Sequence, residues 1–166
     1  SRRKTTNNHS FAAAVAPSHN YDEQRVRDAI AILGQDPDRD LLCAYCDDPA
    51  QTWDHVFATV KNSRFSGYGH RLGNLLPCCK PCNSAKGNKE WRRFLVELGL
   101  PASKYQVAEH RIGTYLSSLS LQDSVPQSSP EYEKLLGLRT EVLVLLAEAD
   151  ELAKLIRDRQ TNAKNK

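Results

Sequence analysis

The chain has 166 residues, of which 40% are hydrophobic and 26% are charged, and its net charge is +3. This length suits one domain, or one compact domain with helices appended to it. No run of 18 or more apolar residues occurs and no signal-peptide pattern is present, so we expect no membrane partner. The chain starts at Ser1 and contains no Met, so we expect it to be a fragment of a longer product.

The positive charge is concentrated in one stretch of the chain. Residues 54–93 contain eight Lys and Arg against two Asp and Glu, whereas residues 1–53 and 94–166 are each slightly acidic. A local excess of basic side chains is typical of a surface that faces a polyanion, although a solvated basic surface would leave the same pattern. Residues 54–93 are therefore the first candidate for a functional region.

The first forty residues carry two different patterns. Residues 1–20 are polar and lack a sustained period, which predicts a flexible arm or linker. Residues 21–40 form an N-terminal helical segment, because apolar residues recur at helical spacing up to Leu33. Asp22 is the expected N-cap of this helix, and Gly34 is its expected stop.

Five cysteines lie within a quarter of the chain. Four of them form two Cys-x2-Cys pairs, Cys43 with Cys46 and Cys79 with Cys82, while Cys78 stands outside both pairs. Disulfide scaffolds usually spread their cysteines over a small secreted domain, whereas two such pairs are typical of a zinc site. We therefore expect a structural Zn²⁺ on the four paired cysteines, and an intracellular (cytoplasmic) protein in a reducing compartment.

The segment between the cysteine pairs holds the polar residues of greatest interest. Residues 53–60 alternate as a strand would and include Asp54 and His55, residues 61–73 form a glycine-bearing loop, and Asn74 re-enters the fold. Neighbouring residues on a strand point to opposite faces. Asp54 and His55 can therefore serve one metal ion only if the strand twists or bulges, or if the substrate bridges them.

Three further helices are expected after the second cysteine pair. An amphipathic helix runs from Asn83 to Gly99 and completes a zinc-bound core over residues 41–98. An accessory helix follows within residues 99–121. Residues 122–130 are rich in Ser, Pro and Gln, which predicts a linker.

A long amphipathic helix is predicted over residues 131–160. Its apolar residues alternate at three- and four-residue spacing over three heptads, at Leu135, Leu138, Val142, Leu145, Ala149, Leu152 and Ile156. One helix cannot bury such a face by itself, so it must pack on the preceding helices or on a second copy of the chain. The linker before it favours a homodimer.

The polar residues and cysteines follow a recognisable order: Asp54-His55, Asn74, Cys79-x2-Cys82, Asn83 and Lys86. This order resembles the HNH (ββα-metal) endonuclease superfamily, and specifically its members with a structural four-cysteine zinc site. The resemblance covers about residues 41–95 and is strongest over residues 73–87. It implies an α+β fold, in which a short antiparallel hairpin and a helix form a small zinc-bound nuclease core flanked by N- and C-terminal helices.

The resemblance also implies a role for each polar residue. His55 would be the general base, Asp54 and Asn83 would hold one Mg²⁺ or Mn²⁺ ion, and Asn74 would fix the loop that carries the base. Asn74 is the alternative metal ligand, but the place of Asn83 directly after Cys82 favours Asn83. The residue types suit this chemistry, because a neutral imidazole can take a proton from water at physiological pH and carboxylate and amide oxygens are hard ligands.

Two groups of basic residues are candidates for DNA contacts. Lys86, Lys89, Arg92 and Arg93 follow Asn83 along the predicted helix, whose N-terminal N–H groups also attract phosphate. Arg64, His70 and Arg71 lie in the loop before Asn74. A solvated face is the alternative reading of both groups.

These features together predict a metal-dependent DNA endonuclease, of the restriction type or the cleavage domain of such an enzyme. A phage or homing nuclease, a junction resolvase and a nuclease toxin are alternatives within the same chemistry. A non-catalytic zinc-containing DNA-binding module is the alternative from another class. The combination of Asp54, His55 and Asn83 argues against that module, because binding alone needs no base.

Overall fold

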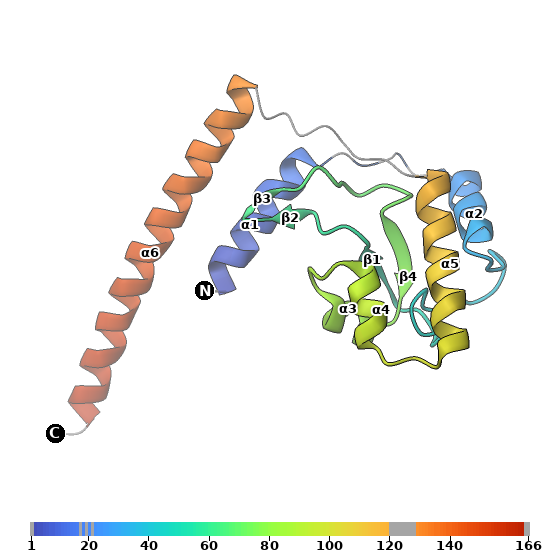
Figure 1. Cartoon of the computed structure of the whole chain (residues 1–166). Helices are drawn as coiled ribbons and strands as arrows, with labels where there is room; N and C mark the ends of the chain where they lie inside the picture. Colours follow the sequence, from blue (N-terminus) through green and yellow to red (C-terminus); the bar gives the residue numbers. More distant parts are fainter. Residues whose placement is uncertain (1, 17, 19, 21, 120–128, 165–166) are drawn as a thin grey trace. The chain divides into compact units, whose positions relative to one another are not determined.

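The computed structural model describes residues 2–16, 18, 20, 22–119 and 129–164. Within these residues the chain is an α+β protein with six helices and two small antiparallel sheets (Figure 1). It divides into two compact units, Ala12–Val125 on the one hand and Ser1–Phe11 with Pro126–Lys166 on the other. Among the described helices, none is both long and apolar enough to cross a membrane.

The larger unit is organised around one pair of strands. β1 (Thr52–His55) is antiparallel to β4 (Leu75–Cys78), so that Thr52 lies opposite Cys78 and His55 lies opposite Leu75. α3 (Lys80–Lys86) begins two residues after β4 and packs on β1. Cys79 is the N-cap of α3, so the second cysteine pair lies where the strand turns into the helix.

Three more helices cover this centre. They are α2 (Glu23–Ile32), α4 (Trp91–Glu97) and α5 (Ala102–Leu119), and α5 packs against both of the others. The predicted ends of α2 are confirmed: the Asp22 side chain accepts a hydrogen bond from the N–H of Arg25, and Gly34 has a φ of 71°. The accessory helix predicted before the linker is also confirmed, as α5.

Residues 56–70 form a hairpin where a strand end and a loop were predicted. β2 (Val60–Lys61) pairs with β3 (Arg64–Phe65), and the two residues between them have φ values of 52° and 65°. Positive φ at both central residues is typical of the type I′ turn that closes tight hairpins. The loop prediction is therefore wrong at β3, because two paired residues per strand are too few to leave an alternating pattern.

The N-terminal residues also depart from the prediction. Residues 2–15, which were expected to be a flexible arm, form helix α1 (Arg2–Val15). Its C-terminal end contains three consecutive alanines, the residue with the highest helix propensity. One of them, Ala12, is buried in a small apolar cluster with Val60 and Phe65 of the hairpin. The helix is thus stabilised by a tertiary contact that its own polar sequence does not reveal.

The helix expected from Asn83 to Gly99 is divided in two. α3 ends at Lys86, Gly87 follows with a φ of 50°, and α4 begins at Trp91 with Glu90 as its N-cap. A left-handed residue ends a helix, and the new N-cap lets α4 leave in another direction. The prediction of one continuous helix is therefore wrong.

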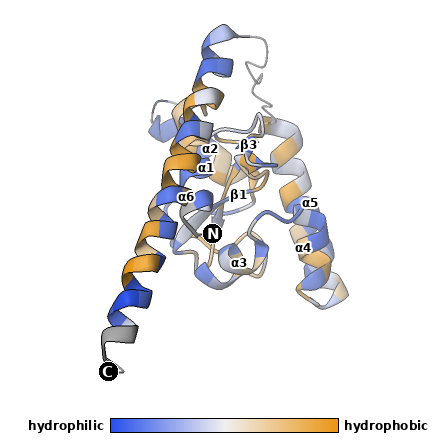
Figure 2. Ribbon diagram, turned by 90° about the vertical axis from the view of Figure 1, so that its left-hand side faces the viewer, coloured by the Kyte–Doolittle hydropathy of each residue, from blue (hydrophilic) through white to orange (hydrophobic). Residues whose placement is uncertain are grey.

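The smaller unit contains the long helix α6 (Pro130–Lys164), as predicted for residues 131–160. The hydroxyl of Ser129 accepts a hydrogen bond from the N–H of Tyr132 and caps the helix. Hydrophobic and polar residues interleave along α6, as Figure 2 shows. The linker predicted at 122–130 lies outside the described residues except for its last two.

Candidate metal centre and active site

Four cysteine side chains converge beside the start of α3. The sulfur atoms of Cys43, Cys46, Cys79 and Cys82 all lie within 4.8 Å of one another. The Sγ of Cys46 is 3.7 Å from that of Cys79 and 3.6 Å from that of Cys82. Four thiolates bound tetrahedrally at the usual Zn–S length of about 2.3 Å would be about 3.8 Å apart. The cluster therefore has the size and the ligands to hold a structural metal ion such as zinc.

Local backbone geometry builds both halves of the cluster. In the first pair, the N–H of Cys43 donates to the carbonyl of Asp48 at 2.7 Å, and Asp47 turns the chain with a φ of 66°. In the second pair, the N–H of Cys82 donates to the Sγ of Cys79 at 3.4 Å. Each Cys-x2-Cys segment is thus a tight turn that presents two sulfurs on the same side, which is why the spacing alone predicts a metal site.

Cys78 lies next to the cluster but outside it. Its Sγ is 3.9 Å from that of Cys43, within hydrogen-bond distance for two sulfur atoms. This hydrogen bond lowers the pKa of Cys43 to about 4. A lowered pKa favours the thiolate, which is the form that binds a metal ion. Cys78 therefore supports one ligand of the cluster without being a ligand itself.

Asp54 is buried in a charged network beneath the strand pair. The hydroxyl of Tyr45 donates to its carboxylate at 2.7 Å, and the Nζ of Lys86 lies 3.0 Å from the same oxygen and 3.3 Å from the other. Burial raises the pKa of Asp54, and the nearby ammonium lowers it in part. Since Asp54 is only 3% exposed, its negative charge is neutralised within the protein.

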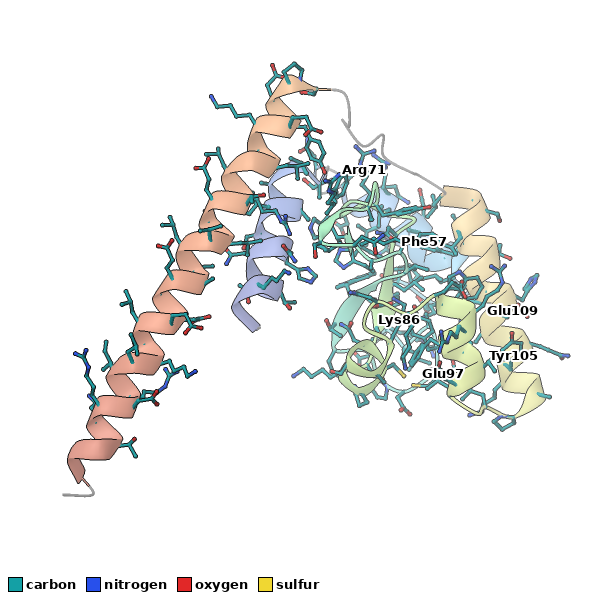
Figure 3. All side chains as sticks on the ribbon, turned by 60° about the vertical axis from the view of Figure 1, so that its left-hand side comes forward. Phe57, Arg71, Lys86, Glu97, Tyr105 and Glu109 are labelled. Carbon is teal, nitrogen blue, oxygen red and sulfur yellow. The ribbon has the colours of Figure 1, made fainter. Side chains whose placement is uncertain are left out.

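Lys86 is not on the surface that was predicted to contact DNA. Lys86 is 1% exposed and lies among the other side chains of the core (Figure 3). Besides Asp54, its Nζ binds the backbone carbonyl of His55, to which it donates at 2.7 Å. The prediction of a DNA contact at Lys86 is therefore wrong. The spacing from Cys82 to Lys86 is one helical turn, so both residues face the strand pair from the same side of α3. From the sequence alone a lysine at the end of a helix is expected to be exposed to solvent, because the pairing with the distant Asp54 cannot be inferred from neighbouring residues.

His55 lies on the other side of β1 from Asp54, as strand alternation requires. Its Nε2 is 2.8 Å from the Nδ1 of His70, and the two rings meet edge to face with their centroids 4.7 Å apart. One of the two nitrogens must carry a proton for the other to accept it. His70, which was predicted as a DNA contact, is thus placed directly against the candidate base.

Asn74 connects three parts of the chain that surrounds His55. Its Oδ1 accepts from the N–H of Phe57 at 2.8 Å, and its Nδ2 donates to the carbonyls of Phe57 at 3.1 Å and Gly69 at 3.0 Å. Its own backbone carbonyl accepts from the N–H of Val56. These bonds hold the two sides of the hairpin together two residues beyond His55, as the expected loop-fixing role would require.

The two predicted ligands of a Mg²⁺-like ion differ in how they are bound, since Asn83 uses only its amide nitrogen whereas both oxygens of Asp54 have partners. The Nδ2 of Asn83 donates to the Oγ1 of Thr52 and the carbonyl of Trp53, while Tyr45 and Lys86 occupy the carboxylate of Asp54. The oxygen ligands are of the type that Mg²⁺ prefers, but Asp54 as arranged does not fit the role. Among the described residues, the cysteine cluster is the one group of three or more His, Cys, Asp or Glu side chains whose ligand atoms converge.

The remaining basic residues form two groups. Lys89 and Arg93 both pair with Glu97, at 2.7 and 2.9 Å, and Arg92 pairs with Glu109 at 3.5 Å while lying over the ring of Trp91. Exposed ion pairs of this kind exchange partners at little cost, so these side chains can still turn to a polyanion. Arg64 lies exposed at the tip of the hairpin, whereas Arg71 is half-buried.

Sequence reasoning missed the residues that support the site from behind. Tyr45 is the second partner of Asp54. Tyr115 on α5 accepts from the N–H of Gly73 and donates to the carbonyl of Leu75, at 2.9 and 2.7 Å, and so holds the start of β4. A side chain on Gly73 would collide with the backbone of Leu119. No local pattern marks these contacts, because the partners are far apart in the sequence.

Comparisons with protein-family models, with curated proteins and with solved structures found no match for this chain.

Proposed function

We propose that this protein is a DNA endonuclease that hydrolyses phosphodiester bonds, with His55 as the general base and a structural Zn²⁺ on the four cysteines. The observation that carries the proposal is the placement of His55. His55 is the last residue of β1, and β1 packs on α3. The Nζ of Lys86 donates to the backbone carbonyl of His55. Its imidazole lies on the side of the strand away from the buried Asp54. This arrangement of two strands and a helix supports the ββα type of nuclease core.

The proposed reaction needs a base in a fixed position. A water molecule attacks the phosphorus atom and gives a proton to the imidazole of His55, while the bond from phosphorus to the 3′ oxygen breaks. The 3′ oxygen leaves with the bonding electrons and takes a proton from solvent. General-base catalysis is effective only when the base is held within hydrogen-bond reach of the water. The bonds from Lys86 to the backbone and from Asn74 to the hairpin provide that support.

A Mg²⁺ or Mn²⁺ ion is part of the proposal, because the reaction builds negative charge on the phosphate. Asn83 and Asp54 are the two oxygen ligands that the sequence suggests. Because Lys86 binds Asp54 but not Asn83, substitution of Asp54 and substitution of Asn83 should have different effects. Asn83→Ala is expected to raise the Mg²⁺ concentration at half-maximal cleavage with little loss of stability, while Asp54→Asn lowers stability first. Cleavage at full rate in EDTA would contradict the metal requirement.

The decisive experiment compares His55→Ala with the wild type on plasmid and phage DNA in Mg²⁺ and in Mn²⁺. We expect cleavage by the wild type and a loss of about 100-fold or more in the variant, with DNA binding retained. His110→Ala removes an exposed histidine on α5 and serves as the control, for which no change is expected. Undiminished cleavage by His55→Ala would contradict the mechanism.

One observation favours a second candidate, a zinc-containing DNA-binding module without activity. The carboxylate of Asp54 is committed to Lys86 and Tyr45, and a binding module needs no metal-ligating carboxylate. Binding of DNA by the wild type without cleavage of any of these substrates would favour this module.

We also propose that a second copy of the chain covers the apolar face of α6, which would bring two sites together for double-strand cleavage by a restriction-type enzyme. Leu138, Leu145 and Leu152 are seven residues apart and 46–63% exposed, and Ile156 continues their row. A heptad row pairs naturally with an identical row. Light scattering should show a dimer that Leu145→Glu dissociates; a monomeric wild type would contradict this.

A further inference from the structure

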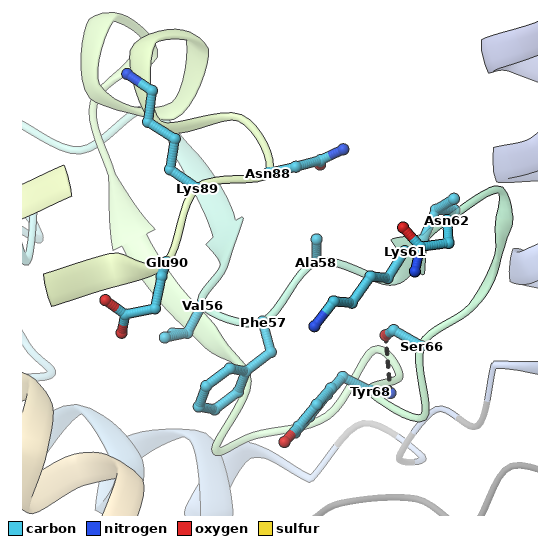
Figure 4. Close-up of a pocket in the computed structure, with 11 residues that line it drawn as sticks. Val56, Phe57, Ala58, Lys61, Asn62, Ser66, Tyr68, Asn88, Lys89 and Glu90 are labelled. Carbon is cyan, nitrogen blue, oxygen red and sulfur yellow. Dashed lines mark hydrogen bonds between the residues drawn. The ribbon is translucent and has the colours of Figure 1, made fainter. Parts of the chain in front are cut away.

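A cavity of about 550 Å³ opens beside the hairpin that begins at His55. Its lining comes from two sides, as Figure 4 shows. The hairpin contributes Phe57, Lys61 and Tyr68, and the connection between α3 and α4 contributes Asn88 and Glu90. A volume of this size matches that of sites for small ligands and single nucleotides rather than that of a protein groove.

The hairpin places this cavity next to the candidate base. Along the hairpin, facing residues follow one register: His55 meets His70, Phe57 stacks on Tyr68, the N–H of Ser66 donates to Thr59, and Lys61 pairs with Arg64. Phe57 follows His55 by two residues and Tyr68 precedes His70 by two, so the aromatic pair is the next facing pair after the histidine pair.

The aromatic pair is rigidly supported. The rings of Phe57 and Tyr68 are 4.4 Å apart with an angle of 26° between their planes. Both the N–H and the carbonyl of Phe57 are bound by Asn74, and the N–H of Tyr68 donates to the hydroxyl of Ser66 at 3.3 Å. Both rings are half-buried, so they expose part of a fixed aromatic surface to the cavity. Such a surface is suited to stacking with a base.

The polar groups around the rings match the other parts of a nucleotide. Lys61 reaches from the hairpin toward the rings and provides a positive charge for a phosphate, as Figure 4 shows. Asn88 offers an amide for the edge of a base, whereas the carboxylate of Glu90 accepts from the N–H of Arg93 and caps α4. Lys89, in contrast, points away from the rings and pairs with Glu97 at 2.7 Å.

We propose that this cavity binds one unpaired nucleotide of the DNA substrate, with its base against Phe57 and Tyr68 and its phosphate near Lys61. A base inside a duplex is stacked on its neighbours and paired, so it must be unpaired or rotated out to enter such a cavity. The substrate class is therefore DNA with a single-stranded or bulged nucleotide beside the scissile bond. The position of the scissile bond rests on the proposed function of His55, whereas the binding of the nucleotide does not.

The test measures binding and cleavage on matched DNAs with the full chain. One duplex is fully paired, a second carries a one-nucleotide bulge of 2-aminopurine, and the third substrate is the single strand with the same 2-aminopurine. Stacking on the aromatic pair is expected to quench the fluorescence of 2-aminopurine in the second and third. We expect Tyr68→Leu to weaken binding of these two by about tenfold or more and to remove the quenching, and Tyr68→Phe to retain both.

Tyr105→Leu is the matched control, since Tyr105 is also half-buried but lies on α5 away from the hairpin. Its binding and quenching should equal those of the wild type, and thermal melting shows which variants are folded. Lys61→Met should weaken the binding of the bulged and single-stranded DNAs and make it depend less steeply on salt concentration, because one phosphate contact is removed.

The outcomes separate this inference from the proposed function. If Tyr68→Leu, folded, binds and cleaves all three DNAs like the wild type, the nucleotide cavity is wrong while the nuclease stands. If binding and quenching depend on Tyr68 but no DNA is cleaved, the cavity stands and the nuclease proposal fails. If a single-stranded RNA of the same sequence binds through Tyr68 and the DNAs do not, the assignment to DNA is overturned.

Discussion

The two ends of the β1–β4 strand pair are held by different chemistry. At one end, the four cysteines join the turn before β1 to the start of α3. At the other end, Tyr45, Asp54 and Lys86 join the same turn, β1 and the end of α3. The cysteine end offers four sulfur ligands to a structural metal ion such as zinc. At the charged end, the carboxylate of Asp54 has all its partners within the chain, in Tyr45 and Lys86.

This difference teaches what each end contributes to the candidate site. A metal cluster ties together segments that have little apolar surface, and its strength depends on the supply of metal. A buried ion pair contributes little net stability, but it is costly to break from one side. The charged end also contacts the backbone of His55, so it is the end that holds the candidate base in position.

The largest expected effect is the loss of the cysteine end. Cys46→Ser should abolish stoichiometric zinc binding and unfold the core, because zinc contributes on the order of 10 kcal/mol to such sites at neutral pH. Metal content and far-UV circular dichroism measure both. Cys78→Ser is the matched control, as Cys78 lies outside the four ligands, and it should keep one zinc per chain. Equal loss of zinc in both variants would contradict the assignment of the ligands.

The next effect is the loss of the charged end. Lys86→Met should lower the free energy of unfolding by about 3–5 kcal/mol, because it leaves the carboxylate of Asp54 buried without its cation. Denaturant unfolding at fixed zinc concentration measures this. The double variant Asp54→Asn with Lys86→Met should be more stable than the sum of the single changes predicts. Additive effects would mean that the two side chains do not interact.

A smaller effect is expected where α5 supports the cysteine end. The guanidinium of Arg111 donates to Asp47 at 2.8 Å and to the carbonyl of Ala44 at 2.7 Å. Arg111→Met should lower the free energy of unfolding by about 1–2 kcal/mol and speed the loss of zinc to a chelator. An unchanged rate of zinc loss would show that the turn is held by its own backbone bonds.

The smallest effect is a change in pH dependence. Burial raises the pKa of Asp54 in the folded protein above its ordinary value, so protonation of Asp54 favours the folded state. The contribution of this residue to stability is greatest below its unfolded pKa and falls as the pH rises through its folded pKa. In Lys86→Met the pKa of Asp54 should be raised further, because the ammonium that lowers it is gone. The difference in the free energy of unfolding between this variant and the wild type should therefore become smaller toward acid pH, by at most about 1.4 kcal/mol per pH unit. A difference that is constant with pH would show that Asp54 does not titrate in this range.

The sequence by itself determined the features that depend on neighbours along the chain. Each Cys-x2-Cys turn places its own two sulfurs, and the caps at Asp22 and Gly34 set the ends of α2 through local hydrogen bonds and backbone freedom. The period of α6 was likewise visible as a pattern. Strand alternation placed Asp54 and His55 on opposite faces, and the structure has them there.

Only the tertiary structure decided what each face meets. The burial of Lys86, the engagement of Asp54 by Tyr45, and the meeting of His55 with His70 all join residues that are 9 to 32 positions apart. The short hairpin strands pack on Ala12 at the C-terminal end of α1, a contact that neither sequence pattern reveals. Contacts of this kind depend on how distant segments pack together, so they cannot be inferred from the pattern of neighbouring residues.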